Sequence, residues 1–250
     1  MNRVPTGIKG FDELVQGGFP ERAAILLSGS PGTGKTIFGL EYVYKGAAEF
    51  GEKGMYISFE QNPEDLREQA RQMGFDEIER LEYEGMLNFV CLPVSVIDKH
   101  TMPDLLENAR ELAVKRIVVD SLSAMAVNTP LLATKSDPVM KQVLEDAEHI
   151  APLMAGEDLK KNFIYKFVAE LKGLDATTIL LSEIPEKSEW LSSDGISEFA
   201  VDGVILVSFE SMGGDFSRSL IIRKMRLTKN DEDIHPVEIS EDGLVVHTIE

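Results

Sequence analysis

Three glycines, a lysine and a threonine stand close together directly behind an apolar run. The run is AAILLS, and GSPGTGKT follows it from Gly29 to Thr36. Glycines let backbone N–H groups approach a polyphosphate closely, and the N-terminus of a following helix attracts the same negative charge. A lysine and a hydroxyl in this order reach the outer phosphates and a Mg²⁺ ion. The pattern predicts a phosphate-binding loop between a strand and a helix.

The residues of this loop that we expect to bind nucleotide are Ser30, Pro31, Gly32, Thr33, Gly34, Lys35, Thr36 and Ile37. Lys35 would contact the β- and γ-phosphates of ATP, and Thr36 would place its hydroxyl on Mg²⁺. Asp120 ends the apolar run RIVVD, which we expect to lie beside the strand of the loop. It would hold the metal through water, although an aspartate at a strand end can also simply cap a turn.

Another carboxylate, Glu60, ends the predicted strand YISFE. Because the carboxyl ends of parallel strands share one edge of a sheet, Glu60 would face the phosphates. It could there activate the water that attacks the γ-phosphate, with Gln61 orienting the same water or the base. Its alternative role is to cap the next helix, which Asn62 fills more naturally because Pro63 follows it.

Strand and helix patterns alternate along the chain. Apolar runs predict strands at residues 23–29, 54–60, 87–94, 116–121 and 177–183. Helical patterns lie at residues 36–51, 62–74, 102–115 and about 138–173. This alternation predicts an α/β fold with a mostly parallel twisted sheet flanked by helices.

The pattern changes after about residue 200. Paired strand patterns with turn residues between them predict antiparallel hairpins at residues 202–228 and 236–249, the second turning at Asp242-Gly243. The loops at residues 128–137 and 185–198 are expected to be the least structured parts. Since no linker divides the chain, we expect residues 1–250 to form one domain.

The composition narrows the classes of function. A net charge of −18 disfavours a surface that grips nucleic acid by its phosphates, although a central pore could be locally basic. Cys91 is the single cysteine and lies in a buried-strand pattern, and the four histidines show no ligand spacing, so we expect no metal site built by the protein alone. There is no apolar run of membrane length and no signal core at the N-terminus, so we expect no membrane association and a cytoplasmic location.

Four segments together resemble a KaiC-type ATPase of the RecA superfamily. They are TGIKGFDELVQGGFPERAAILLSGSPGTGKT, YISFEQNPEDLREQARQMGF, RIVVDS and GVILVSFE…RSLIIRKMRLTKND, and they follow the family's order over essentially the whole chain. The resemblance implies a RecA-like P-loop fold that binds ATP or ADP with Mg²⁺ and hydrolyses ATP. It also implies a homo-oligomer, usually a hexameric ring, with nucleotide at each subunit boundary.

The resemblance further assigns residues beyond the phosphate-binding loop. It implies that Lys224 and Arg226 reach the γ-phosphate of the nucleotide bound by the neighbouring subunit. The residues it places around the base are Gln72, Met73, Gly74 and Phe75, with Thr228, Ser240 and Glu241 approaching from the next subunit.

Three departures from the family pattern bear on function. Family members often carry two glutamates where this chain has Glu60-Gln61, which leaves Glu60 as the only strong base there. Asn230 stands where clock KaiC has a histidine. The clock protein has two such domains and this chain one, so a timing function is not supported.

Three functions stay open from the sequence. The first is a ring-forming Mg-ATPase that regulates a client protein, which the sequence does not identify. The second is a recombinase-like or translocase-like ATPase acting on DNA, but the charged residues of the loop PEKSEWLSSDGISE, after the predicted strand 177–183, are mostly acidic. The third is a nucleotide-dependent scaffold that does not hydrolyse ATP, for which Gln61 is the only support.

Overall fold

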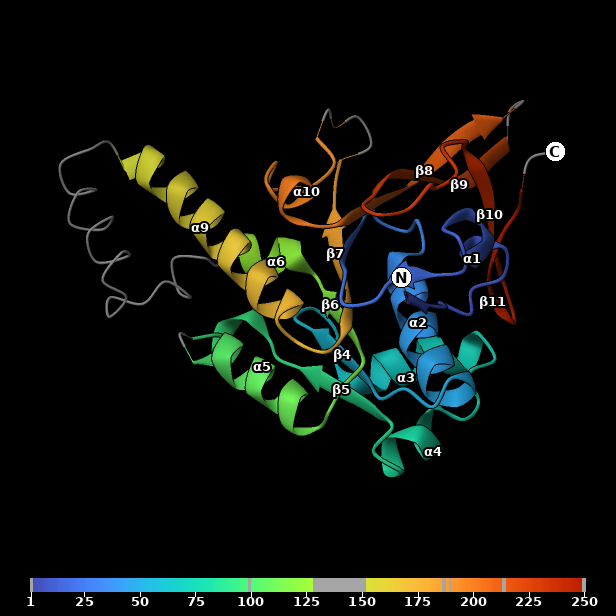
Figure 1. Cartoon of the computed structure of the whole chain (residues 1–250), viewed down its shortest axis with the longest axis horizontal. Helices are drawn as coiled ribbons and strands as arrows, with labels where there is room; N and C mark the ends of the chain where they lie inside the picture. Colours follow the sequence, from blue (N-terminus) through green and yellow to red (C-terminus); the bar gives the residue numbers. More distant parts are fainter. Residues whose placement is uncertain are drawn as a thin grey trace.

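The computed structural model describes residues 2–98, 100–127, 152–185, 188, 190–212 and 215–248. Within these residues one sheet has nine strands in the order β11-β10-β9-β8-β3-β7-β6-β4-β5 (Figure 1). The parallel strands are β3 (Ala24–Gly29), β4 (Gly54–Ser58), β5 (Leu87–Cys91), β6 (Arg116–Asp120), β7 (Thr177–Glu183) and β8 (Gly203–Met212). The antiparallel strands are β9 (Asp215–Met225), β10 (His235–Ser240) and β11 (Gly243–Val246). The short strands β1 (Arg3–Val4) and β2 (Phe19–Pro20) form a separate pair.

Helices cover both faces of the sheet (Figure 1). On one side lie α2 (Lys35–Glu49), α3 (Pro63–Gln72) and α4 (Ile78–Tyr83), and on the other lie α5 (Thr101–Glu111) and α9 (Pro152–Lys172). The shorter helices are α1 (Phe11–Leu14), α6 (Leu122–Val127), α10 (Ser197–Ala200) and the 3₁₀ turn η1 (Val94–Val96). In the described part of the chain, no helix is both long enough and apolar enough to cross a bilayer.

The two helical layers create two apolar cores, one on each face of the sheet. Along β3, Ile25 and Leu27 join the core under α2, while Leu26 joins the core under α9. A strand covered on both faces has no polar side, which is why β3 is apolar throughout its first half.

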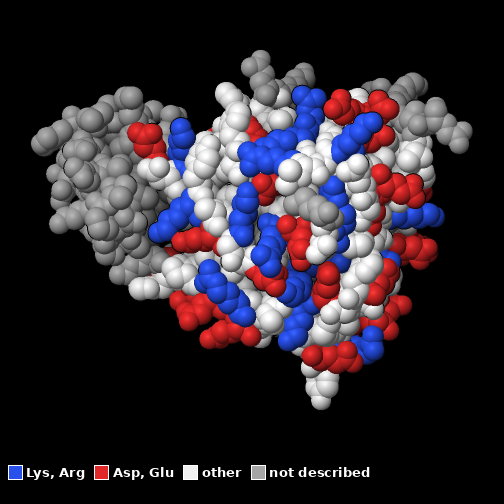
Figure 2. Space-filling view, in the orientation of Figure 1, with Lys and Arg blue, Asp and Glu red and all other residues white. Residues whose placement is uncertain are grey.

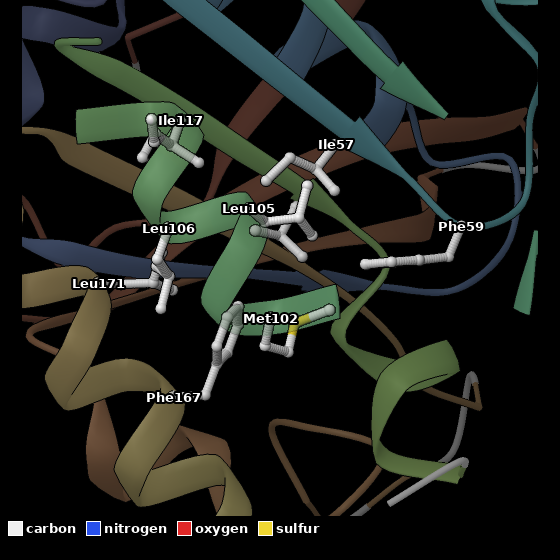
Figure 3. A pocket seen from close by; sticks show the side chains of 10 residues that line it. Ile57, Phe59, Met102, Leu105, Leu106, Ile117, Phe167 and Leu171 are labelled. Carbon is white, nitrogen blue, oxygen red and sulfur yellow. The ribbon is translucent and has the colours of Figure 1, made fainter. Parts of the chain in front are cut away.

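The core on the α9 side is tightly filled (Figure 3). Side chains from α5 and α9, such as Leu105 and Phe167, meet Ile57 of β4 and Ile117 of β6. The space left between them is about 10 Å³, which is room for at most about one water molecule. This layer therefore serves as a rigid support for the sheet and not as a ligand site.

The predicted fold class and the C-terminal hairpins are confirmed, but two expectations about strand position are wrong. β6 does not lie beside β3, because β7 pairs with both of them and separates them. β5 is an edge strand, so Cys91 is only half-buried, and this burial raises the pKa of its thiol. An apolar run shows that a strand is covered but carries no information on which strands are its neighbours.

Other predicted elements differ at their ends. β4 stops at Ser58, so Glu60 lies two residues beyond the strand and not at its last position. The predicted helix at about 138–173 is seen as α9 over its second part, and residues 138–151 lie outside the described residues. The predicted loop 128–137 also lies outside them, and the loop 185–198 leads into α10.

A buried arginine ties α2 to β6. The Arg116 side chain is completely buried, and its Nε donates to Glu52 Oε2 at 2.6 Å while Nη1 donates to the Tyr42 carbonyl at 3.0 Å. The guanidinium lies 4.8 Å from the Tyr42 ring centroid and 4.9 Å from that of Phe50. A Cβ on Gly46 would come within 2.3 Å of Arg116 Cδ, so only glycine leaves space for this side chain.

We predict that Glu52→Gln lowers the free energy of unfolding by about 1–3 kcal/mol, because a buried guanidinium then loses its charged partner. The matched control is Asp175→Asn, which removes an exposed carboxylate paired with Arg22 and Lys115 and is expected to cost about 0–1 kcal/mol. Urea denaturation of both variants measures the difference. Equal losses for the two variants would contradict the role assigned to the Arg116 pair.

Candidate functional site

The phosphate-binding loop has the predicted order of strand, loop and helix. It leaves β3 after Gly29 and enters α2 at Lys35, with Gly32 and Gly34 at φ of +81° and +101°. These positive φ values are the left-handed backbone region that glycine adopts without strain. Inside the loop, the buried Thr33 donates its hydroxyl to the Ser30 carbonyl at 2.8 Å.

The Lys35 side chain folds back onto the phosphate-binding loop. Its Nζ donates to the carbonyls of Gly29 at 2.9 Å and Ser30 at 3.0 Å, and the side chain is buried. Burial lowers the pKa of Lys35, while the charges of Glu183, Asp120 and Glu60 oppose that effect. The ammonium group is thus already at the loop and surrounded by acidic groups that favour its charge.

A cavity of about 330 Å³ runs beside the loop. Its lining residues are Pro31, Gly32, Gly34, Lys35, Thr36, Ile37, Glu60, Gln61, Gln69, Asp120, Glu183, Arg218 and Ile239. The volume suits a small ligand, and polar and charged side chains make up much of the lining. Most of the residues that the sequence assigned to phosphate, metal and water chemistry therefore meet at one place.

Asp120 lies at this cavity although β7 separates its strand from β3. Helix α2 crosses over β6 so closely that a Cβ on Gly39 would lie 2.9 Å from Val118 Cγ1. This crossing brings the Thr36 hydroxyl within 3.2 Å of Asp120 Oδ2, to which it donates. The expected contact between Thr36 and Asp120 is therefore present. It arises because helix α2 crosses over β6, and not because β3 and β6 are adjacent strands.

The Asp120 carboxylate is held by hydrogen bonds. Burial raises the pKa of Asp120, whereas the hydrogen bonds from Tyr56 and Thr36 lower it. The Tyr56 hydroxyl donates to Asp120 Oδ2 at 2.6 Å, and burial together with the charge of Asp120 raises the pKa of Tyr56, so this donor keeps its proton.

The donor set at this point fits Mg²⁺. A threonine hydroxyl and a carboxylate are hard oxygen ligands, which Mg²⁺ prefers together with phosphate and water. The described residues contain no group of three or more His, Cys, Asp or Glu side chains arranged to hold a metal ion. A Mg²⁺ ion here would take its other ligands from a bound nucleotide and from water.

Glu60 is exposed at the cavity and is oriented by a serine. Ser121, which follows Asp120 through a cis peptide bond, donates its hydroxyl to Glu60 Oε1 at 2.6 Å. The capping alternative for Glu60 is not realised, because Asn62 Oδ1 accepts the backbone N–H groups at the start of α3. Gln61 Oε1 accepts a hydrogen bond from Gln69 Nε2 at 3.2 Å.

The structure adds two charged cavity residues that the sequence reasoning missed. Arg218, on β9, donates to the Gly32 carbonyl at 3.3–3.4 Å and lies over the Phe209 ring. Its position depends on the register of the hairpin, for which no local pattern exists. Glu183 ends β7 and could have been found by the rule that pointed to Glu60, since the carboxyl ends of parallel strands meet.

The segment expected near the base packs within its own chain. Gly74 has a φ of +71°, and a Cβ there would lie 2.6 Å from the Glu241 carbonyl oxygen. Phe75 is buried and stacks on Tyr44, with ring centroids 4.6 Å apart. The turn at Ser240 and Glu241 thus contacts the Gly74 segment of the same chain. The approach of these two residues to the base on a neighbouring subunit stays a prediction. None of the expected base-contacting residues lines the cavity described above.

Lys224, Arg226 and Thr228 lie at the other end of the strands from the phosphate-binding loop, at the edge of the sheet where the parallel strands begin. In the register, Met225 pairs with Gly203 and Gly203 with Ile25, whereas Gly29 pairs with Val207. The level of Ile25 and the level of Gly29 are four residues apart along β3, which corresponds to about 13 Å.

Each of these three side chains has a partner of its own at that edge. Lys224 Nζ donates to the carbonyls of Glu198 and Val201 at 3.0 and 2.7 Å, and Thr228 Oγ1 accepts from Arg3 at 2.7 Å. Arg226 Nη1 donates to Asp202 Oδ1 at 3.2 Å. The structure therefore does not bring these residues to the phosphate-binding loop of their own chain.

Comparisons with known proteins agree over nearly the full length. A family model described as "ATPase: KaiC" matches residues 4–162 and 147–250. A UPF0273 protein of Methanocaldococcus jannaschii is 32% identical, with 99% of this chain and 97% of the relative covered. A UPF0273 protein of Thermotoga maritima is 29% identical, with 100% and 98% covered. The crystal structure of a KaiC-like protein from the hyperthermophilic archaeon Pyrococcus horikoshii superimposes with a TM-score of 0.79 and 32% identity over 99% of each chain.

We predict that Lys35→Ala weakens ATP binding by about 10- to 100-fold, because the phosphates lose a charge-assisted hydrogen bond. Titration with a fluorescent ATP analogue measures the affinity. The control is Lys45→Ala on the same helix, where Lys45 pairs with Glu49 and does not line the cavity. An unchanged affinity for Lys35→Ala would contradict the assignment of the loop.

Proposed function

Because the chain belongs to the KaiC family of ATPases, in the RecA superfamily, we propose that it binds ATP with Mg²⁺ beside the phosphate-binding loop and hydrolyses ATP to ADP and phosphate. The observation that carries this proposal is the meeting of Lys35, Thr36, Asp120 and Glu60 at one cavity. They come from three separate segments of the chain, so their meeting is a property of the fold. We treat residues 1–250 as one ATPase domain.

In this proposal the loop residues bind the phosphates. Lys35 Nζ exchanges its bonds to the Gly29 and Ser30 carbonyls for phosphate oxygens, and the N-terminus of α2 adds backbone N–H groups. Thr36, and Asp120 through water, would hold Mg²⁺, which would supply positive charge beside the phosphates. Arg218 supplies a further cation beside Gly32.

Glu60 is the proposed general base. It is exposed at the cavity, and the Ser121 hydroxyl fixes one carboxylate oxygen, leaving the other free to accept a proton from water. Gln61 is the next side chain along the cavity and already accepts from Gln69, so it is placed to orient water but carries no charge.

The site is completed by a second copy of the chain. Lys224 and Arg226 lie about 13 Å from the level of their own phosphate-binding loop, so they reach a γ-phosphate only on another subunit. The exposed apolar side chains Phe199 and Leu227 flank them, as expected for a surface that a partner covers. We propose a homo-oligomeric ring, hexameric as the family resemblance implies, that changes state with the bound nucleotide and so regulates a client.

The charge distribution favours this function over one on nucleic acid. Figure 2 shows Lys and Arg gathered along the middle of one face, with Asp and Glu among and around them. On the face shown, this mixed charge does not form the continuous basic track that follows a nucleic-acid backbone.

We predict that Glu60→Gln binds ATP with near-normal affinity but loses most of its turnover, by about 100-fold or more, because the water loses its base. Phosphate release measures turnover, and nucleotide titration measures affinity. Gln61→Ala is the matched variant and is expected to retain more activity. A Glu60→Gln variant as active as the unchanged protein, with Gln61→Ala inactive, would show that Glu60 is not the base and that the orientation of water by Gln61 matters more.

We predict that Arg226→Ala also binds ATP but turns over slowly, since a cationic group acting on the transferred phosphoryl contributes about 10³-fold or more. Mixing Arg226→Ala with Glu60→Gln should then restore part of the activity, because some boundaries combine an intact Glu60 with an intact Arg226. Mass measurements confirm that subunits exchange during mixing. Activity that stays at the level of the separate variants despite exchange would show that the site is not shared.

A further inference from the structure

One carboxylate holds two cations at the edge of the sheet where Arg226 lies. Asp202, directly before β8, accepts Lys172 Nζ at 2.7 Å and Arg226 Nη1 at 3.2 Å on the same oxygen, Oδ1. Its other oxygen accepts the Ala24 backbone N–H at 3.1 Å. The Asp202 carbonyl also accepts the Arg226 backbone N–H at 2.9 Å. Arg226 is thus attached to one residue through both its main chain and its side chain.

The burial and the charge of Asp202 suit it to hold the longer side chain of Arg226 in place. The Asp202 side chain is 13% exposed, whereas that of Arg226 is 51% exposed. Partial burial alone would raise the pKa of Asp202, but the hydrogen bonds from Lys172, Ala24 and Arg226 lower it, so the group is ionised. A mostly buried carboxylate therefore holds the exposed guanidinium of Arg226.

The guanidinium of Arg226 faces a cavity. A cavity of about 490 Å³ is lined by Arg226, Lys172, Arg22 and Leu227, together with Asp202. A guanidinium has five N–H donors, and the bond to Asp202 uses one of them, so the others remain for an oxyanion. The cavity lining carries three cations, Arg22, Lys172 and Arg226, against the two carboxylates of Asp202 and Glu21, so it keeps a net positive charge that attracts phosphate.

We propose that Asp202 is the positioning residue for Arg226 and holds its guanidinium in the geometry that meets the nucleotide of the neighbouring subunit. The inference rests on the proposed function, in which that nucleotide lies at a shared boundary. An exposed arginine samples many rotamers, and a group that is already placed when charge develops contributes more to catalysis than one that must first be ordered. Asp202 does not touch the nucleotide in this scheme and acts only through Arg226.

The test is Asp202→Asn. The asparagine oxygen still accepts the Ala24 N–H, but the charge that holds Arg226 is lost. We expect kcat to fall by about 10- to 100-fold, with KM for ATP nearly unchanged, because the phosphate-binding loop lies at the other edge of the sheet. Asp202→Glu keeps a carboxylate and is expected to recover part of kcat. Asp175→Asn, which removes a carboxylate that also pairs with two cations, is the control and is expected to keep kcat.

Two further measurements separate positioning from a merely structural role. In the Arg226→Ala background, Asp202→Asn should cause no further loss of kcat, because the side chain that it holds is gone. A structural role would lower kcat in both backgrounds, and this comparison holds even if the substitution lowers stability. In mixing experiments, Asp202→Asn should regain activity with Glu60→Gln but not with Arg226→Ala.

The outcomes distinguish this inference from the proposed function. If Arg226→Ala is slow but Asp202→Asn turns over normally, or if these two variants complement each other, Asp202 does not position Arg226 and the shared site still holds. If Arg226→Ala itself turns over normally, the shared site is wrong and the inference falls with it.

Discussion

The close contact between α2 and the sheet is the constraint on which the site depends. Gly39 lets the helix approach Val118, and Gly46 leaves space for the buried side chain of Arg116. Both contacts fix α2 over β6, although the helix begins directly after β3. The contact between Thr36 and Asp120, which form the proposed metal site, depends on this crossing, because β3 and β6 are not adjacent in the sheet. A bulkier residue at either glycine would move the start of the helix away from Asp120.

The carboxyl edge of the sheet concentrates charge, and each charge is compensated locally. Lys35 is buried, but three carboxylates lie near it, and the loop carbonyls accept hydrogen bonds from its ammonium group. Asp120 is buried as well, and Tyr56 and Thr36 donate to it. Unpaired buried charges are costly, so such groups persist only where hydrogen bonds or a ligand offset the loss of water. The arrangement therefore favours a ligand that carries both negative phosphate oxygens and a cation.

The groups of the proposed reaction lie at two opposite ends of the parallel strands. The carboxyl edge carries the loop, Asp120 and Glu60, and the opposite edge carries Lys224 and Arg226, each held by groups of its own chain. The antiparallel direction of β9 sets this separation, since the strand runs back from the level of Arg218 at the loop to Arg226 at the far edge. In the proposed function, β9 supplies Arg218 to its own site, and Arg226, directly after the end of β9, acts at the site of a second copy.

The local parts of this protein could be predicted from its sequence: the phosphate-binding loop, the α/β alternation, the C-terminal hairpins and the cap at Asn62. Each depends on residues that are neighbours in the chain, so backbone preference and periodicity suffice to specify it. The tertiary structure alone decided that β7 separates β3 from β6, that Arg218 lies beside Gly32 and that Asp202 holds Arg226. These facts join segments that are far apart in the chain, and their physical origin is the order and register of strands, which depend on how whole faces pack and not on any local pattern.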